Sequence, residues 1–179
     1  MKTASVPPPG AAPVATARLV CRPALTRAAL ADHHAIRHEV FSREQAVFAG
    51  SDLDEHDGAH GSIRLVGYYQ GVAAGSVRLF ELSNGIWQGD RLAVLAPYRV
   101  HGVGAPLVRC AVATAAARGG TEMVAHVQLP NVVFFTRLGW TAVGPTETYV
   151  GLPHQQMRIP LPGLDAGAAL VARFAAGIV

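Results

Sequence analysis

Residues 92–105 read LAVLAPYRVHGVGA, and this stretch decides how the rest of the chain is interpreted. It predicts a strand that ends near Val94, then a turn, then a helix that begins among closely spaced glycines. Gly102 and Gly104 lack a Cβ atom, so a ligand can approach the backbone closely there. The first amide groups of a helix have no partner within the helix and carry partial positive charge, so such an end binds phosphate oxygens. Together with the guanidinium of Arg99, the stretch predicts a cradle for a pyrophosphate group.

Two other phosphate-binding loops do not fit this spacing. The dinucleotide loop needs G-x-G-x-x-G and an acidic residue at the end of the next strand, and the triphosphate loop needs G-K-[ST]. Neither pattern is present around residues 92–105. From this stretch alone, an ordinary glycine-rich turn between a strand and a helix remains the alternative.

The rest of the pattern predicts one α/β (α+β) domain. The elements expected are a strand at 18–21, a helix at 26–41 capped by Thr26, a strand pair at 63–69 and 72–82 joined by Gln70-Gly71, a strand at 87–94 after an Asn84-Gly85 turn, a helix at 102–118, a strand at 122–128, a short helix at 131–138, and closing strands at 149–152 and 157–161. This order predicts a mixed sheet with one right-handed crossover. Residues 1–16 are expected to be a disordered Pro/Ala-rich arm, 17–162 the globular domain, and 163–179 a tail that could form a helix.

The composition argues against several classes of function. Of the 179 residues, 50% are hydrophobic and 15% are charged, which is enough apolar material for a core. The formal net charge of +3 is small and scattered, which argues against a nucleic-acid partner. Apolar runs are too short or too broken to span a membrane, and prolines interrupt the N-terminal segment, which argues against a signal peptide. We therefore expect a cytoplasmic monomer or homodimer, in which Cys21 and Cys110 are lone, reduced and buried.

Four motifs resemble those of the GNAT superfamily of acyl-CoA-dependent N-acyltransferases. The R-x-x-G-x-G pattern that follows the strand is similar to the family's acyl-CoA-binding motif. NVVFFTRLGW at 131–140 resembles its later helix-and-turn signature, which usually ends F-Y-x-x-L-G-F. IRHEVF at 36–41, followed by Glu44-Gln45, and GLPHQQM at 151–157 resemble elements of some bacterial members. The resemblance covers residues 18–161, and the closest likeness is to a bacterial subgroup associated with nitrogen starvation.

This resemblance implies a fold, a reaction and a cofactor site. It implies a mostly antiparallel sheet with a V-shaped splay between two central parallel strands, and transfer of an acetyl group from acetyl-CoA to a primary amine of a small molecule. The residues implied to hold acetyl-CoA are Leu92, Ala93, Val94, Arg99, Val100, His101, Gly102, Val103, Gly104, Ala105, Asn131 and Phe134. Two alternatives stay open. One is an acyltransferase with another acyl donor, similar to acyl-homoserine-lactone synthases, and the other is a non-catalytic acyl-CoA sensor.

Proton transfer is less clearly assigned. Acyl transfer to an amine needs a neutral amine, a polarised thioester carbonyl and a proton for the leaving thiolate. In the family a tyrosine often donates that proton, but the corresponding residue here is Phe135, which cannot. The candidate catalytic residues are Glu44, to bind or deprotonate the amine, His154, in a proline-containing turn, and His126, as a substitute acid or else a core histidine.

Other polar residues have two interpretations each. A polar loop is expected at 50–58, where Asp52, Asp54 and Asp57 either line an amine-binding rim or are solvated. Arg78 and Arg91 either support the cradle or an acidic group of the substrate, or form structural ion pairs. No metal ion is expected, because the histidine pairs at i, i+4 spacing lack the glutamate of a metalloprotease motif or fall in a loop.

Overall fold

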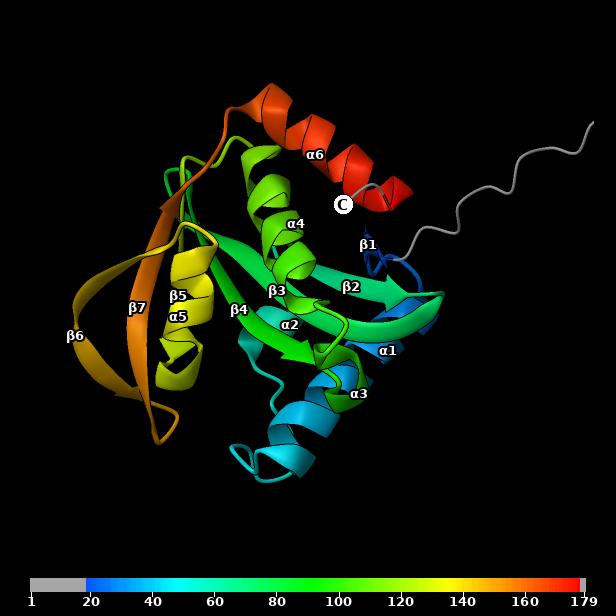
Figure 1. The fold of residues 1–179 in the computed structure, drawn as a ribbon, viewed down its shortest axis with the longest axis vertical. Coiled ribbons are helices and arrows are strands. Elements are labelled where there is room, and N and C mark those ends of the chain that lie inside the picture. Colours follow the sequence, from blue (N-terminus) through cyan, green and yellow to red (C-terminus); the bar gives the residue numbers. More distant parts are fainter. Residues whose placement is uncertain (1–18, 178–179) are drawn as a thin grey trace, which may run out of the picture.

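The computed structural model describes residues 19–177, so the arm expected at 1–16 lies outside the described residues. The described chain forms one seven-stranded sheet with helices packed against it (Figure 1). Its strands are β1 (Leu19–Pro23), β2 (Ile63–Tyr69), β3 (Val72–Ser83), β4 (Ile86–Val94), β5 (Glu122–Gln128), β6 (Thr141–Tyr149) and β7 (Leu152–Pro160). Across the described chain their order is β1-β2-β3-β4-β5-β7-β6, in which β4 and β5 are the one parallel pair. The predicted class, a mixed and mostly antiparallel sheet flanked by helices, is confirmed.

Helices cover both faces of the sheet. One layer contains α1 (Arg27–Arg37), the π-helix η1 (His38–Glu44) and α2 (Glu55–Gly58), and the other contains α4 (Gly104–Ala116), α5 (Val132–Arg137) and α6 (Leu164–Ala176). The short helix α3 (Ala96–Arg99) connects β4 to α4, and the 3-10 turn η2 (Leu129–Asn131) connects β5 to α5. Successive residues of a strand face opposite sides, so Leu65 packs with Leu107 under α4, whereas Val66 packs with Ile36 of α1.

Helix boundaries follow local capping groups. Thr26 caps α1 as predicted, because its hydroxyl accepts a hydrogen bond from the amide of Ala29 at 3.1 Å. The helix expected to run to residue 41 changes at His38 into a π-helix. The stretch expected as a plain loop at 50–58 contains α2, because Asp54 caps this helix and Asp57 completes a capping box.

Three two-residue turns join antiparallel strands. Both residues of each turn have positive φ in Gln70-Gly71 (50° and 82°), Asn84-Gly85 (49° and 80°) and Val150-Gly151 (48° and 73°). The first two contain the residue types that favour such turns, and their prediction is confirmed. The third shows that the strand expected at 149–152 is wrong, since these residues cross from β6 to β7. β6 is a largely exposed edge strand, so its apolar alternation is weak in the sequence.

The residues expected as a tail form α6, which packs on α4. A Cβ atom on Gly167 would lie 2.7 Å from the Cβ atom of Ala116, so only glycine permits this approach of the two helices. Within residues 19–177, no helix combines the length and the apolar character needed to cross a bilayer.

The parallel strands β4 and β5 separate along their length. They pair through Ile86↔Glu122, Trp87↔Met123 and Gln88↔Val124, and beyond these residues the described strands do not pair with each other. β3 still pairs with β4 as far as Val94, and β7 pairs with β5 as far as Gln128. The two halves of the sheet therefore stay intact while they diverge (Figure 1). This confirms the predicted V-shaped splay, which opens toward the carboxyl ends of both strands.

Candidate active site

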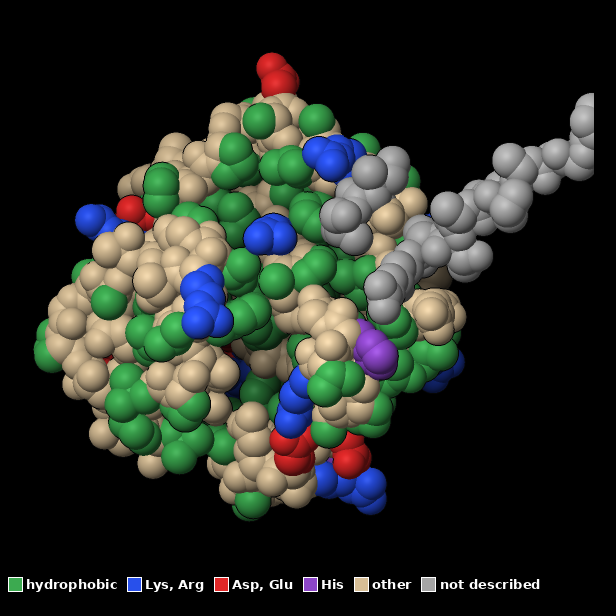
Figure 2. Space-filling model, viewed as in Figure 1, with side chains coloured by type: hydrophobic (Ala, Val, Ile, Leu, Met, Phe, Trp, Pro, Cys, Tyr) green, Lys and Arg blue, Asp and Glu red, His purple; other side chains and the backbone are tan. Residues whose placement is uncertain are grey.

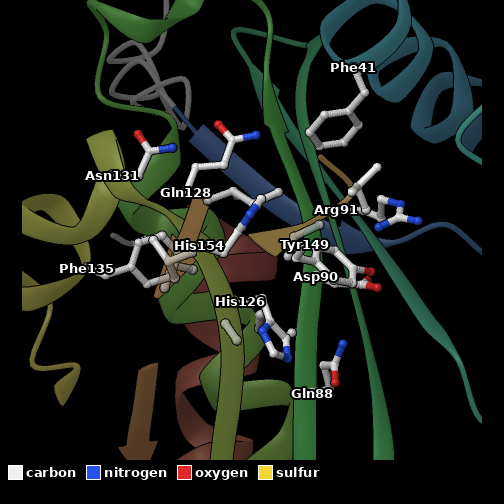
Figure 3. A pocket seen from close by; sticks show the side chains of 18 of the residues that line it. Phe41, Gln88, Asp90, Arg91, His126, Gln128, Asn131, Phe135, Tyr149 and His154 are labelled. Atoms are coloured by element: carbon white, nitrogen blue, oxygen red, sulfur yellow. The ribbon is translucent and has the colours of Figure 1, made fainter. Parts of the chain in front are cut away.

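A pocket with a cavity volume of about 140 Å³ occupies the splay between β4 and β5. Its wall combines residues of both strands, the end of η1, α4, α5 and the β6–β7 hairpin. Figure 3 shows His126, Tyr149 and His154 in its interior, with Phe135 on one side and Arg91 on the other. From outside, the molecular surface is hollowed between α5 and α3 (Figure 2).

A bulge in β4 turns the backbone toward this pocket. The strand register advances from Arg78↔Asp90 to Ser76↔Ala93, so β4 contains one residue more than β3 over this interval. Arg91 adopts a φ of 50° here, and the backbone at Asp90 and Arg91 lines the pocket. Because this part of β4 has no β5 partner, its polar backbone groups are free to bind an extended ligand.

The predicted phosphate cradle lies at the open end of the splay. Gly102 adopts a φ of 70°, and α4 begins two residues later at Gly104. Among residues 19–177, no side chain caps α4, its first turn holds no acidic residue, and the amides of Gly104 and Ala105 have no protein acceptor. Phe134 of α5 lies beside this turn, with its Cζ atom 3.5 Å from the position of a Cβ on Gly104. The turn therefore presents a free helix N-terminus next to the pocket.

The other residues predicted to hold acetyl-CoA surround the same turn in different ways. Leu92, Ala93 and Val94 form the strand end, where Ala93 is buried and the other two are half-buried. Val100 and His101 are exposed on the turn, Val103 is buried beneath it, and Asn131 lines the pocket at the start of α5. Val103 can therefore offer only its backbone to a ligand.

Two polar contacts hold the end of η1 across the mouth of the splay. The guanidinium of Arg99 donates to both carboxylate oxygens of Glu44 at 2.6 Å, and its Nε donates to the carbonyl of Val94 at 3.0 Å. The next residue, Gln45, accepts from Nε2 of Gln128 at 3.2 Å. One contact reaches the end of β4 and the other the end of β5. The hydrogen bonds from Arg99 hold the pKa of Glu44 below its usual range, which weakens this carboxylate as a base.

His154 has a fixed ring orientation in the pocket wall. Its Nδ1 lies 2.9 Å from the carbonyl of Leu152, and a carbonyl can only accept, so Nδ1 carries the proton. In the neutral ring, Nε2 then keeps a free lone pair. The side chain is buried and lines the pocket. This arrangement suits a general base.

His126 lies against a residue that the sequence interpretation missed. Its ring stacks on that of Tyr149, with centroids 5.3 Å apart, and Tyr149 also contacts the ring of His154 edge-on at 5.4 Å. Nδ1 of His126 is buried and has no hydrogen-bond partner in the described chain. Tyr149 thus connects the two predicted histidines and brings a phenol into the pocket (Figure 3).

Phe135, which the motif resemblance puts in the place of a tyrosine acid, lies in the wall of the pocket. It is buried, and its ring packs edge-on against Trp140 at 5.3 Å and Phe134 at 5.5 Å. It lines the pocket as a purely apolar wall. This side chain therefore cannot donate a proton to a ligand in the pocket.

Behind the pocket, three arginines and four aspartates form a network of ion pairs. Its members are Arg37, Arg78, Arg91, Asp52, Asp54, Asp57 and Asp90. Arg37 and Arg78 are completely buried, and Arg78 pairs with Asp54 at 2.5 Å and Asp90 at 2.6 Å. The interpretation of the aspartates as solvated loop residues is therefore wrong. Arg78 and Arg91 form structural ion pairs, one of the two roles expected for them.

This network has one carboxylate more than it has guanidiniums. Burial alone would raise the pKa of Asp57, but hydrogen bonds and the charge of Arg37 outweigh burial and hold this pKa well below its usual range. Burial would also raise the pKa of Asp54, but the hydrogen bond from Arg78 and the charges of Arg78 and Arg91 outweigh burial and lower this pKa. Counted at formal charges, the seven side chains sum to −1, and the guanidinium of Arg64, which donates to the Asp57 carbonyl, adds a positive charge beside them. Two members, Asp90 and Arg91, reach the pocket wall.

The two cysteines differ from expectation in one respect. Cys21 of β1 and Cys110 of α4 are free and buried, as predicted, but they are neighbours in space. A hydrogen bond between the two thiols and their burial raise the pKa of Cys21, so this thiol stays protonated. In the part of the chain that the structure describes, no three His, Cys, Asp or Glu side chains are grouped as a metal site.

Comparison with known proteins agrees with this geometry. The model of the acetyltransferase (GNAT) family matches residues 27–140. The chain belongs to the GNAT family. It is 30% identical over 129 residues to an uncharacterised N-acetyltransferase, YjcF of Bacillus subtilis. The aligned segment covers 72% of this chain and 90% of the relative. Membership of this family makes the chain an acyltransferase, and the family uses acyl-CoA as co-substrate.

Solved structures share the fold of this chain. A proposed N-acetyltransferase from Lactobacillus plantarum superposes with a TM-score of 0.74 and 24% identity, over 80% of this chain and 99% of the other. A CoA-dependent acyl-homoserine lactone synthase, BjaI, superposes with a TM-score of 0.66 and 16% identity, over 88% of this chain and 89% of the other. At these identities the likeness concerns the fold alone.

Proposed function

We propose that this GNAT protein transfers an acyl group from acyl-CoA to the primary amine of a small molecule. One observation carries the proposal. The uncapped N-terminus of α4 lies at the open end of a splay that contains a pocket with a buried, oriented histidine. A ligand with phosphates at one end and an amide-containing arm fits this arrangement from end to end. The expected cytoplasmic location, the monomeric or homodimeric state and the likeness to the nitrogen-starvation subgroup form part of the proposal.

CoA would bind along the line from the turn to the pocket. The amides of Gly104 and Ala105 would hold the pyrophosphate, because they have no protein acceptor among the described residues. The unpaired backbone of β4 near Leu92 would pair with the pantetheine amides and orient the thioester. Phe134 and Asn131 would flank the arm from the α5 side.

The proposed reaction forms one C–N bond and breaks one C–S bond. Nε2 of His154 would accept the proton that the amine loses as it attacks the thioester carbonyl, and a polar backbone group of the β4 bulge would stabilise the oxyanion. The thiolate would leave with a proton from His126 or from the Tyr149 phenol stacked on it. Glu44 would position the mouth of the pocket through Arg99 rather than accept a proton.

The charge behind the pocket favours a cationic acceptor. Amines reach the site mostly as ammonium ions at neutral pH, and the carboxylate-bearing residue Asp90 lines the pocket. The arginines of the network, Arg37, Arg78 and Arg91, are all paired with aspartates, so none of them is left to bind an acidic group of the acceptor. We therefore infer an amine without a carboxylate next to the reacting nitrogen.

Turnover with a panel of amines tests this proposal. Release of free CoA thiol from acetyl-CoA should depend on the added amine, and the amine should gain the mass of the acyl group. Diamines and simple alkylamines should react better than α-amino acids of equal size. Binding of acetyl-CoA without any amine-dependent thiol release across the panel would favour the sensor alternative and contradict the proposal.

A further inference from the structure

A second cavity, of about 140 Å³, lies in the α4 layer of the molecule, outside the candidate active site. Helices α4 and α6, the end of α5 and the strand β7 form its walls. Val108 and Trp140 lie between the two spaces, since both residues line both of them. The proposed reaction assigns nothing to this second cavity, which we call the α4–α6 groove.

The lining of the α4–α6 groove is apolar, and Arg109 is the one charged residue among the described residues that form it. Val112, Leu138, Ile159 and Leu170 pack against the main core, but each of them is only half-buried. An engineered apolar cavity of about 150 Å³ binds benzene, so this groove has room for one leucine or phenylalanine side chain. A hollowed apolar surface of this kind is typical of a site that another molecule covers.

Three exposed arginines surround the groove. Arg109 of α4 lines it. Arg137 ends α5 next to the lining residue Leu138, and Arg173 of α6 lies next to the lining residue Phe174. Within residues 19–177, none of these three arginine side chains forms a hydrogen bond or an ion pair. All three guanidiniums are therefore available to a partner.

The surroundings of the groove offer no compensating negative charge. Helices α4 and α5 contain no acidic residue, and α6 contains only Asp165, in its first turn. Figure 2 shows basic side chains over α4, α5 and α6, with apolar side chains between them. The surface therefore matches a ligand that carries carboxylates on more than one side of an apolar group.

Other occupants fit this surface less well. A two-fold dimer through this face would place the same arginines on both sides of the interface, and like charges repel. Residues 1–18 of the chain contain no acidic residue that could pair with the arginines. A lipid surface takes up apolar side chains that project from a protein, whereas the apolar side chains here line a hollow.

We propose that the α4–α6 groove binds an acidic segment of a partner protein, which inserts one leucine or phenylalanine side chain among Arg109, Arg137 and Arg173. Carboxylates beside that side chain pair with the three guanidiniums, so charge selects the partner and the apolar contact holds it. This interaction is separate from the proposed acyl transfer, because the groove shares only Val108 and Trp140 with the catalytic pocket.

Selection from a phage library of short random peptides, on the immobilised full-length protein, tests this inference. The enriched peptides should carry several Asp or Glu residues around a Leu or Phe, and the best synthetic peptide should bind more weakly as salt is added. Arg109→Glu should weaken this peptide roughly tenfold, because it replaces an attraction by a repulsion. Enrichment of neutral or basic peptides, or of none, would overturn the inference.

The matched control is Arg27→Glu, in the helix layer on the other face of the sheet. Arg27 is also exposed and has no side-chain partner in the described chain, so its reversal should leave the affinity for the peptide unchanged. An equal loss in the two variants would mean that only the net charge of the protein matters, which contradicts a site at the groove.

A reciprocal exchange of charges separates recognition from a change in the fold. In the triple variant Arg109→Glu/Arg137→Glu/Arg173→Glu, the peptide with lysine at every acidic position should bind more tightly than the original peptide. The three side chains are exposed, so the fold tolerates their replacement. Failure of the preference to reverse would overturn the inference. Displacement of the original peptide from the wild type by CoA or by phosphatidylserine vesicles would also overturn it, since the arginines would then belong to a phosphate site.

Discussion

Glu44 and Arg99 form a two-fold hydrogen-bonded ion pair, with both N–O distances at 2.6 Å, between the end of η1 and the turn that follows β4. The sequence interpretation placed Glu44 on the acceptor side as a catalytic residue and Arg99 in the phosphate cradle. The pair brings these two sides into direct contact at the mouth of the splay. Because Arg99 also donates to the carbonyl of Val94, the pair ties η1 to the strand that carries the bulge.

Replacement of Glu44 by glutamine separates a positioning role from a basic role. The hydrogen bonds from Arg99 hold the pKa of Glu44 below its usual range, so this carboxylate is ionised throughout the working pH range. Glu44→Gln should lower kcat/KM for the amine by about fivefold or less, since the pair is partly exposed and such pairs contribute at most about 1 kcal/mol. The pH profile of kcat should keep its shape, and a profile that loses its acidic limb would show that Glu44 is the base after all.

Gly104→Val tests the cradle. A Cβ at Gly104 meets only Phe134 and Val94, at 3.5 and 3.8 Å, so the free protein can accommodate a side chain there. The ligand cannot, because the pyrophosphate must approach the amides of the first turn closely. The melting-temperature increase produced by CoA should disappear in this variant. Gly163→Val, at the N-terminus of α6, is the matched control and should keep the increase, because nothing lies within 4 Å of its Cβ position.

His154→Asn tests the proposed base. Asparagine keeps a short N–H donor for the carbonyl of Leu152 but has no basic nitrogen. Loss of a general base typically costs about 10²–10⁴-fold, so kcat should fall by that order while the dissociation constant of CoA stays unchanged. A variant that turns over normally would place the base elsewhere, and His126→Ala, measured in parallel, would show whether the stacked histidine contributes.

Arg78→Met tests the network behind the pocket. This arginine is completely buried and is bound by Asp54, Asp57 and Asp90, so its removal leaves carboxylates without their counter-charge. Breaking a buried pair from one side costs about 3–5 kcal/mol, which denaturant unfolding can measure. Arg158→Met removes an exposed arginine, 3.6 Å from Glu122, and should cost less than about 1 kcal/mol. Equal losses in the two variants would mean that the buried network does not stabilise the fold.

The burial of His33 predicts how the stability of the fold depends on pH. Burial, with the charge of Arg37 and of His34, lowers the pKa of this fully buried histidine to about 3. The unfolded chain takes up the proton near pH 6.5, so the stabilisation is complete above that pH and is lost as the pH falls toward 3. Between pH 7 and pH 5 the free energy of unfolding of the wild type should fall by about 2 kcal/mol through His33. It should fall further through His34, whose pKa is also lowered. His33→Phe should lose clearly less than the wild type, and parallel losses would contradict the assignment.

Much of the fold follows from short-range signals that the chain contains. The Asn84-Gly85 turn and the Thr26 cap are each set by residues close in sequence, and each is where it was expected. The β6–β7 hairpin was misplaced because its turn, Val150-Gly151, starts with a residue that rarely adopts positive φ, and because its edge strand faces solvent. Neither this turn nor the exposed edge strand is marked by a local sequence pattern.

The candidate site was predictable where it depends on backbone and hidden where it depends on distant side chains. The glycine spacing after β4 identifies the helix N-terminus, since the binding groups there are amides. Three contacts form between residues that are separated in sequence, and no local pattern marks them. They are the stacking of Tyr149 on His126, the ion pair of Asp52 with Arg37, and the contact between Cys21 and Cys110. The GLPHQQM motif was the one signal near Tyr149, and it directed attention to His154 alone.

A crystal structure of the protein with CoA tests the central claim most directly. The account predicts pyrophosphate oxygens within hydrogen-bond distance of the amides of Gly104 and Ala105. It also predicts the sulfur atom between β4 and β5, beyond the Gln88↔Val124 pair and beside His154. A CoA molecule held at another helix end, or one whose arm lies outside the splay, would contradict it.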